Sequence, residues 1–213
     1  MRRVVITGMG IVSSIGNNKD EVLNSLQNGK SGIVAMPEFA EMGFRSHVAG
    51  TVKDLDLNKF IDKRDLRFMG KGSAYACIAM QQAISDAGLS DDIISNEKTG
   101  LIVGSGVPSV ENLEKTIDIT REKGPKRVGP FMVPKTMSST CSATLATSFK
   151  IRGYNYSITS ACSTSAHCIG NAYELISWGK QDVMFAGGGE ELHWGMAVQF
   201  DVMSVLSTKY NDT

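Results

Sequence analysis

Residues 154–186, YNYSITSACSTSAHCIGNAYELISWGKQDVMFA, contain the pattern of a strand, a helix and a second strand in succession. The β-branched and aromatic residues of 154–159 predict the first strand, and the turn residues that follow close it. Residues 163–178 predict a helix, and the apolar run 183–186 predicts the second strand. A strand, a helix and another strand form the unit of a parallel sheet. This stretch therefore predicts an α/β fold.

The rest of the chain extends the same alternation. Small and apolar residues recur at helical spacing in 72–87, and Gly88 then ends the run. Asn18 with Glu21 three residues later is the signature of a capping box, so a helix should begin there and end at Gly29. The other elements that we expect are a strand at 3–7, a surface excursion at 39–65, a buried strand at 101–103, a helix and a loop within 108–136, and a helix at 138–149.

The amino-acid composition limits the kinds of partner that the protein is expected to bind. The 213 residues are 42% hydrophobic and 21% charged, and their 22 basic residues balance 22 acidic ones. Such a chain has no global field that favours nucleic acid or an anionic membrane. The basic start, Arg2-Arg3, resembles that of a signal peptide, but Thr7, Gly8 and Gly10 interrupt the apolar run. No run of 18 apolar residues is present to span a bilayer. We expect a cytoplasmic protein that binds neither nucleic acid nor membrane.

The four cysteines predict neither disulfides nor a metal site. They form no Cys-x-x-Cys pair, and a chain of this size does not need disulfides to be stable. Cys77 and Cys141 lie among alanines and predict buried free thiols. Cys168 follows Cys162 by six residues on another helical face, which disfavours a shared metal. We expect no cofactor.

Cys162 differs from the other three because it lies between the strand 154–159 and the helix 163–178. A thiol at a helix start faces the positive end of the helix dipole and the unpaired amides of the first turn, and both favour the thiolate. Its neighbours Ala161, Ser163 and Ser165 are small, as a bulky substrate would require. The alternative is a small residue buried at a helix start. The position predicts a nucleophile whose own amide could form half of an oxyanion hole.

Four strings resemble segments of the β-ketoacyl synthases and occur in the order expected for that family. They are VITGMGIVSSIGNN at 5–18, SACSTSAHCIGNA at 160–172, FAGGGEE at 185–191 and LSTKYND at 206–212. The resemblance covers essentially the whole chain and is closest to the type I synthase of bacterial fatty-acid synthesis. It implies that residues 1–213 form the N-terminal half of a thiolase-like fold, a βαβαβαββ mixed sheet with helices on its faces, cut before the second half.

The resemblance also implies a reaction and its partners. Cys162 would take an acyl chain from acyl carrier protein, after which malonyl-carrier protein loses carbon dioxide and its carbanion attacks the acyl thioester. Members of the family are homodimers, and two histidines from the second half assist decarboxylation. This sequence holds only His47, His167 and His193, and none matches those positions. Five residues after Cys162, His167 should point about 140° away from it at about 100° per residue. We expect structural or surface roles for all three.

Two further sets of site residues follow from the resemblance. Met196, Phe200 and Met203 match the region lining the acyl pocket, although their helical spacing alone predicts core packing. Lys63, Arg64, Arg67, Lys126 and Arg127 match basic residues that dock the acidic carrier protein, although such residues commonly form only a solvated helix end.

Other functions compete with this interpretation. The glycines of Gly8-Met9-Gly10 and 187–189 are typical of nucleotide-binding loops, but tight strand-to-helix turns account for both. A non-catalytic module for acyl or carrier-protein binding, or for dimerisation, would fit a scaffold without its second half. Another acyltransferase with a thiolase fold is a third alternative. The complete string around Cys162 favours a condensing enzyme.

Overall fold

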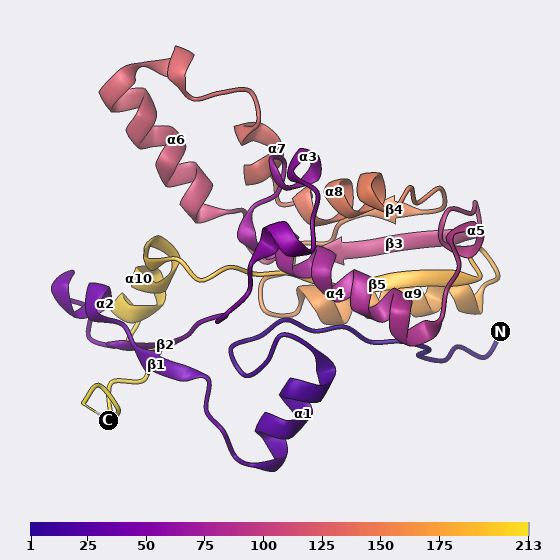
Figure 1. Cartoon of the computed structure of the whole chain (residues 1–213), viewed down its shortest axis with the longest axis horizontal. Coiled ribbons are helices and arrows are strands. Elements are labelled where there is room, and N and C mark those ends of the chain that lie inside the picture. Colours follow the sequence, from indigo (N-terminus) through magenta and orange to yellow (C-terminus); the bar gives the residue numbers. More distant parts are fainter. Residues whose placement is uncertain (213) are drawn as a thin grey trace. The chain divides into compact units, whose positions relative to one another are not determined.

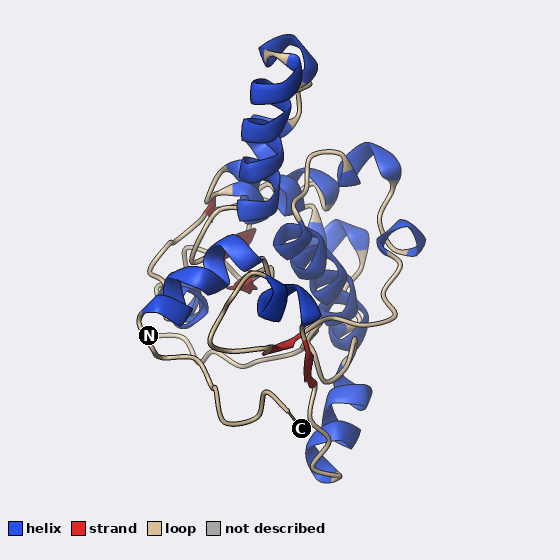
Figure 2. Cartoon of the chain, turned by 90° about the vertical axis from the view of Figure 1, so that its left-hand side faces the viewer, coloured by secondary structure: helices blue, strands red, loops and turns tan. Residues whose placement is uncertain are grey.

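The computed structural model describes residues 1–212. The chain divides into two compact units, each described by itself. The larger unit comprises residues 1–10 and 56–191, and the smaller comprises 11–55 and the residues from 192 on. Helices predominate and the strands are short, as Figure 2 shows. No helix within residues 1–212 is long and apolar enough to cross a membrane.

A three-stranded parallel sheet forms the centre of the larger unit (Figure 1). Its middle strand, β3 (Thr99–Gly104), is buried throughout and pairs with β4 (Asn155–Tyr156) on one side. On the other side it pairs with β5 (Val183–Gly188), from Thr99 opposite Val183 to Gly104 opposite Gly188. Burial on both faces explains why the core of β3 is a continuous apolar run.

Two crossover helices cover opposite faces of this sheet. The strand order is β4-β3-β5. The connection from β3 to β4 through α8 (Thr140–Ser148) therefore moves from the middle of the sheet to one edge. The connection from β4 to β5 through α9 (Thr164–Ser177) runs back past β3. Right-handed connections that run in opposite directions place their helices on opposite faces, and α8 and α9 lie on opposite sides of the sheet in Figure 1. On the α9 face, Ile102 of β3 packs with Cys168, Ala172 and Leu175.

The long helix α4 (Lys71–Ala87) packs against α8 and ends as predicted. Gly88 has a φ of 62°, the left-handed conformation that glycine adopts without strain. The N-terminal segment runs against this helix. A Cβ on Gly10 would overlap the backbone of Ala79, so close approach to α4 explains why residue 10 is glycine. The nucleotide-loop interpretation of this segment is therefore not needed.

The predicted strand at 3–7 is wrong. Within residues 1–212 no strand pairs with it, and Val5 and Ile6 are 60% and 80% exposed. The segment is held instead by Arg2, whose backbone N–H donates to the Ser177 carbonyl at 2.9 Å. The Arg2 guanidinium also pairs with Asp182 at 2.6 Å. A β-branched run becomes a strand only where a neighbouring strand supplies hydrogen-bond partners.

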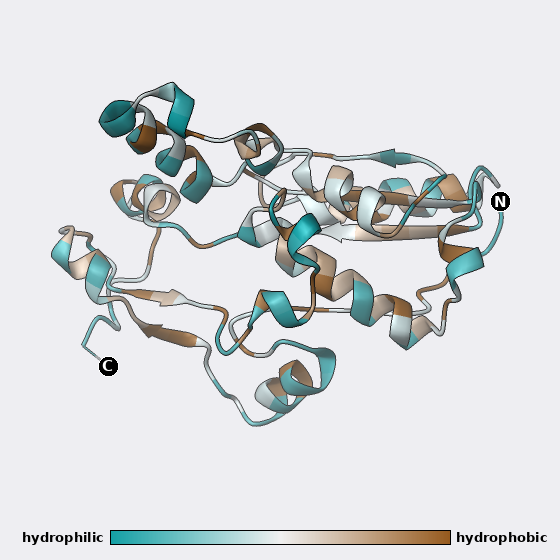
Figure 3. Cartoon of the chain, turned by 45° about the horizontal axis from the view of Figure 1, so that its top comes forward, coloured by the Kyte–Doolittle hydropathy of each residue, from teal (hydrophilic) through white to brown (hydrophobic). Residues whose placement is uncertain are grey.

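The remaining elements of the larger unit are helical. They are η1 (Leu57–Lys59), α3 (Lys63–Leu66), α5 (Asp91–Ile94), α6 (Val110–Lys123), η2 (Pro125–Arg127) and α7 (Met132–Thr136). Helix α6 has no buried residue and is largely hydrophilic (Figure 3). Strand β4 is shorter than the predicted 154–159. The Ser157 hydroxyl donates to the Val103 carbonyl at 2.7 Å, a side-chain bond that competes with the ladder.

The smaller unit contains α1 (Lys19–Gln27), α2 (Pro37–Glu41), α10 (Trp194–Val202) and an antiparallel pair of strands, β1 (Ile33–Ala35) and β2 (Val48–Gly50). The predicted cap of α1 is confirmed, because the Asn18 side chain accepts from the N–H groups of Asp20 and Glu21. Treating 39–65 as a surface excursion was wrong in part. Phe39 and Phe44 are buried and stacked with centroids 4.6 Å apart, and β2 lies within this range.

Candidate active site: the turn at Cys162

Cys162 lies in a sharp turn just before α9, and its side chain is exposed. The preceding residue, Ala161, has a φ of 51° although it is not glycine. A side chain in this left-handed region costs roughly 1 to 2 kcal/mol. Such a conformation persists only where the surroundings hold it, and it is characteristic of functional sites. In this turn the Cys162 side chain is exposed.

Short hydrogen bonds within residues 160–164 hold this turn. Thr164 is only 3% exposed, and its hydroxyl donates to the Ala161 carbonyl at 2.7 Å. The same hydroxyl accepts from the Ser160 N–H at 2.9 Å. The N–H groups of Ser163 and Thr164 donate to the carbonyls of Ser160 and Ala161. Two backbone amides at the start of the helix are therefore engaged in the turn and are not free to stabilise a thiolate.

His167 also contacts this turn, but through Ser160. Its Nδ1 lies 2.6 Å from the Ser160 hydroxyl oxygen. Elsewhere, His47 Nε2 lies 3.0 Å from the Phe44 carbonyl oxygen, and His193 Nδ1 accepts from the Gly195 N–H at the start of α10. These contacts agree with structural roles for the three histidines. The bond to Ser160 was missed because helical geometry predicts only which face His167 occupies.

The other three cysteines are buried free thiols, as predicted for Cys77 and Cys141. Burial, with a smaller contribution from Asp65, raises the pKa of Cys77 to about 11. Burial raises the pKa of Cys141 to about 12, and the Glu190 carboxylate adds to this. Burial also raises the pKa of Cys168. Since the thiolate is the reactive form, these three are poor nucleophiles near neutral pH.

A second turn lies behind Ala161. Glu190, just past the end of β5, accepts a hydrogen bond from the Gly106 N–H, and the Ser105 hydroxyl lies 3.1 Å from its other oxygen. A Cβ on Gly106 would lie 3.1 Å from the Ala161 carbonyl oxygen, so the two backbones are in close contact. In the sequence, Glu190 stands out only as part of the string at 185–191. A carboxylate that follows a strand and a glycine run was the available signal, and it is a weak one.

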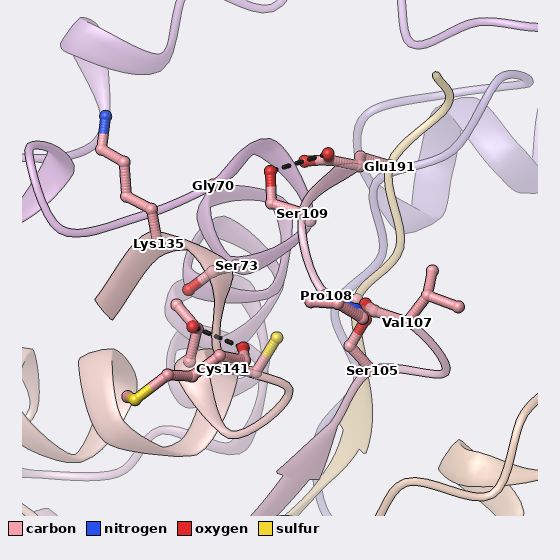
Figure 4. A pocket seen from close by; sticks show the side chains of 13 residues that line it. Gly70, Ser73, Ser105, Val107, Pro108, Ser109, Lys135, Cys141 and Glu191 are labelled. Atoms are coloured by element: carbon pink, nitrogen blue, oxygen red, sulfur yellow. Dashed lines mark hydrogen bonds between the residues drawn. The ribbon is translucent and has the colours of Figure 1, made fainter. Parts of the chain in front are cut away.

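A small pocket opens beside this second turn (Figure 4), with room for about one water molecule. Its lining includes Ser73, Ser105, Val107, Ser109, Lys135, Cys141 and Glu191. Glu191 accepts from the Ser109 hydroxyl at 2.7 Å, and the Lys135 amine points away from Ser73 and Cys141 in Figure 4. Burial, with repulsion from Lys115, lowers the pKa of Lys135. The pocket is too small for an acyl chain.

The residues expected to line an acyl pocket are on a different unit from Cys162. Met196 and Phe200 belong to α10, and Met203 is its C-cap. Phe200 is 36% exposed and Met203 is 65% exposed, so they do not form a core within the described chain. The buried residue of α10 is Asp201, which accepts from the N–H groups of Arg45 and Ser46 at 2.9 Å each. The acyl-pocket assignment stays a prediction.

The two basic segments are linked through aromatic rings. Lys63 and Arg64 are exposed on α3, and Lys126 and Arg127 are exposed on η2. The Arg67 guanidinium lies 5.0 Å from the ring centroids of both Phe68 and Phe131, which pack edge to face. Phe131 follows Arg127 by four residues, so this contact joins the segments that carry the two basic groups.

A buried parallel sheet that presents a single exposed cysteine on a strained strand-to-helix turn is the arrangement expected of an α/β protein with a cysteine nucleophile. The family model "Beta-ketoacyl synthase, N-terminal domain" matches residues 1–213. The chain therefore belongs to the β-ketoacyl synthases, and the resemblance inferred from its motifs is confirmed.

Curated relatives include 3-oxoacyl-[acyl-carrier-protein] synthase 1 of Haemophilus influenzae, which is 59% identical over 214 residues, covering 100% of this chain and 52% of that protein. The synthase 1 of Escherichia coli K12 is 58% identical over 215 residues, covering 100% and 53%. Among solved structures, a β-ketoacyl synthase from Burkholderia phymatum superposes with a TM-score of 0.89 at 31% identity, over 100% of this chain and 52% of that one. The chain spans about half the length of the relatives that it matches.

The site predicts an order of thiol reactivity. Cys162 should be alkylated by limiting iodoacetamide before the other three cysteines, by at least about tenfold in rate, because its thiol is exposed whereas burial disfavours the thiolate of the other three. Peptide mapping by mass spectrometry after a short exposure measures this. Preferential labelling of Cys77 or Cys141 would contradict the assignment of Cys162 as the reactive thiol.

Proposed function

We propose that this chain supplies the nucleophile of a condensing enzyme of fatty-acid synthesis, with Cys162 as the residue that is acylated. The observation that carries the proposal is the exposed thiol on a strained turn, in a chain whose other thiols are buried with raised pKa values. Family membership supports it, because the relatives at 58% and 59% identity are named for acyl-carrier-protein substrates.

The first step that we assign to this chain is acyl transfer. The Cys162 thiolate attacks the carbonyl carbon of an acyl thioester on the carrier protein. The bond between that carbon and the carrier's sulfur then breaks, and the carrier's thiol leaves with the proton given up by Cys162. We assign the Cys162 amide as one donor to the oxyanion formed in between, since a backbone N–H beside the nucleophile suits that role. The second donor would come from outside this chain.

The second step is condensation, which needs groups that this chain does not carry. The malonyl group of a second carrier protein loses carbon dioxide, and the electron pair left behind attacks the carbonyl carbon of acyl-Cys162. Cys162 leaves as thiolate, and the lengthened β-ketoacyl chain stays on the carrier. In the family, two histidines from the second half bind the malonyl thioester and assist decarboxylation. We propose that the complete enzyme is a cytoplasmic homodimer, with Met196, Phe200 and Met203 lining the acyl pocket.

Because decarboxylation depends on groups of the second half, we predict that the 213-residue chain alone does not release carbon dioxide from malonyl-carrier protein. Loss of one donor to a developing oxyanion typically costs roughly 100- to 1,000-fold in rate, and the chain lacks several. Addition of a separately made second half, taken from the Escherichia coli synthase 1, should restore release. The assay is liberation of labelled carbon dioxide. Robust release by the chain alone, unchanged by the second half, would show that a complete site exists within these residues.

Carrier-protein docking is a separate prediction. Reversing the charges of Lys63 and Arg64 with Lys63→Glu and Arg64→Glu should weaken binding of acyl carrier protein by roughly tenfold at low salt and flatten its salt dependence. Both residues are in the first turn of α3, where glutamate is well tolerated, so the fold should persist. Arg67 is left unchanged because its guanidinium also packs on two rings.

The matched control reverses two exposed charges elsewhere, with Lys150→Glu and Arg152→Glu. It should leave the affinity within about twofold of that of the unmodified chain, since exposed charges away from the interface contribute little. Binding is measured by fluorescence anisotropy of labelled carrier protein at several salt concentrations. Equal weakening by both pairs would place the docking site elsewhere.

A further inference from the structure

We propose that Glu190 is a positioning residue for Cys162 and acts through the turn formed by Ser105 and Gly106. The proposal concerns the cysteine to which the proposed function assigns acyl transfer. It depends only on the geometry around that cysteine, however, and not on which substrate it accepts. No part of the acyl-transfer scheme above uses this carboxylate.

The first link is between Glu190 and Gly106. One carboxylate oxygen accepts the Gly106 N–H, and the other lies 3.1 Å from the Ser105 hydroxyl oxygen. That hydroxyl has one proton and lies closer, at 2.5 Å, to the Val107 carbonyl oxygen. The hydrogen bond from the Gly106 N–H is therefore the main contact between Glu190 and this turn. Gly106 is half-buried and Glu190 is exposed, so the bond costs less to lose than one between fully buried groups, but without it the turn is free to move.

The second link is between Gly106 and Ala161. A Cβ on Gly106 would lie 2.9 Å from a Glu190 carboxylate oxygen and 3.1 Å from the Ala161 carbonyl oxygen. Both distances are shorter than ordinary carbon contacts, so a side chain here would crowd the carboxylate and the Ala161 carbonyl. The turn therefore lies beside both the carboxylate and the residue that precedes Cys162.

The third link is the strain at Ala161. Its φ of 51° is unfavourable, and Thr164 supports it from the helix side. The turn at Ser105 and Gly106 lies next to its carbonyl on the sheet side, and we assign it the second support. If that support shifts, Ala161 can relax toward an ordinary conformation, and the thiol of Cys162 then loses its exposed position. Glu190 would thus control how often the thiol is presented for reaction.

The neighbouring residue provides a matched control. Glu191 is bound in the same way, since its carboxylate accepts from the Ser109 hydroxyl at 2.7 Å and the Glu111 N–H at 3.2 Å. These partners lie farther along the chain than Gly106. A change at Glu191 should cost a similar amount of stability without moving the support behind Ala161.

The experiment compares two substitutions that separate shape from charge. Glu190→Gln removes the charge but keeps the reach, because its amide oxygen can accept from Gly106 while its NH₂ donates to the Ser105 hydroxyl. Glu190→Asp keeps the charge but is shorter by one methylene, which withdraws the carboxylate from Gly106. The readout is the second-order rate of Cys162 alkylation by iodoacetamide, followed by peptide mapping, with urea unfolding recorded for each variant.

We expect Glu190→Asp to slow alkylation about tenfold, the equivalent of losing one hydrogen bond to a charged group. Glu190→Gln and the control Glu191→Asp should both stay within about twofold of the unmodified chain. If Glu190→Gln changes the rate while Glu190→Asp does not, charge rather than position matters, and the proposal is wrong. Equal slowing by Glu190→Asp and Glu191→Asp would also overturn it, because it would reflect general destabilisation.

A further variant tests the contact without changing the carboxylate. Gly106→Ala places a methyl group between Glu190 and Ala161, and it should slow alkylation of Cys162 by a similar factor. A rate within twofold of the unmodified chain would overturn the proposal even if Glu190→Asp failed to fold. None of these measurements uses acyl carrier protein. A failure of the positioning role and a failure of the acyl-transfer proposal are therefore distinguishable.

Discussion

Cys162 is presented to solvent because the backbone just before it passes through a conformation that residues with side chains resist. Ala161 has a φ of 51°, and its surroundings are built to keep it there. The Thr164 hydroxyl closes the turn from the helix side, and the neighbouring backbone at Gly106 is the support that we propose on the sheet side. That second support requires the sheet to be parallel and buried, because β5 must end beside β3 for Glu190 to bind Gly106. The fold and the reactive turn therefore depend on one another.

The different surroundings of the four thiols also leave Cys162 as the most reactive cysteine. Three are enclosed by helices and sheet, where burial disfavours the thiolate, and raises the pKa of Cys77 to about 11 and that of Cys141 to about 12. The fourth lies on the exposed turn. A chain with four equivalent thiols would be open to unwanted acylation and oxidation, since both follow thiolate character and exposure. Because the other three thiols are buried, they compete little with Cys162 for acyl groups and oxidants.

Local patterns predicted the elements that depend on local chemistry. Alanine spacing and Gly88 predicted α4, an apolar run predicted β3, and the strand-to-helix pattern placed Cys162 at a turn. Patterns failed where the outcome depends on a distant partner. The run at 3–7 has strand composition but no neighbouring strand within the described residues, and the hold of Glu190 on Gly106 joins positions 84 residues apart. No periodicity reports such a pair, so the support behind Ala161 could be found only in the structure.

Intact-mass spectrometry shows whether Cys162 accepts an acyl chain. The chain is incubated with acyl-carrier protein, alone and with a separately made second half, beside a Cys162→Ala variant. We expect a mass increase equal to one acyl group, located on the peptide that contains Cys162 and absent from the variant. The second half should increase the yield. An acyl group that appears equally in the Cys162→Ala variant, or that maps to another residue, would show that Cys162 is not the acylated residue.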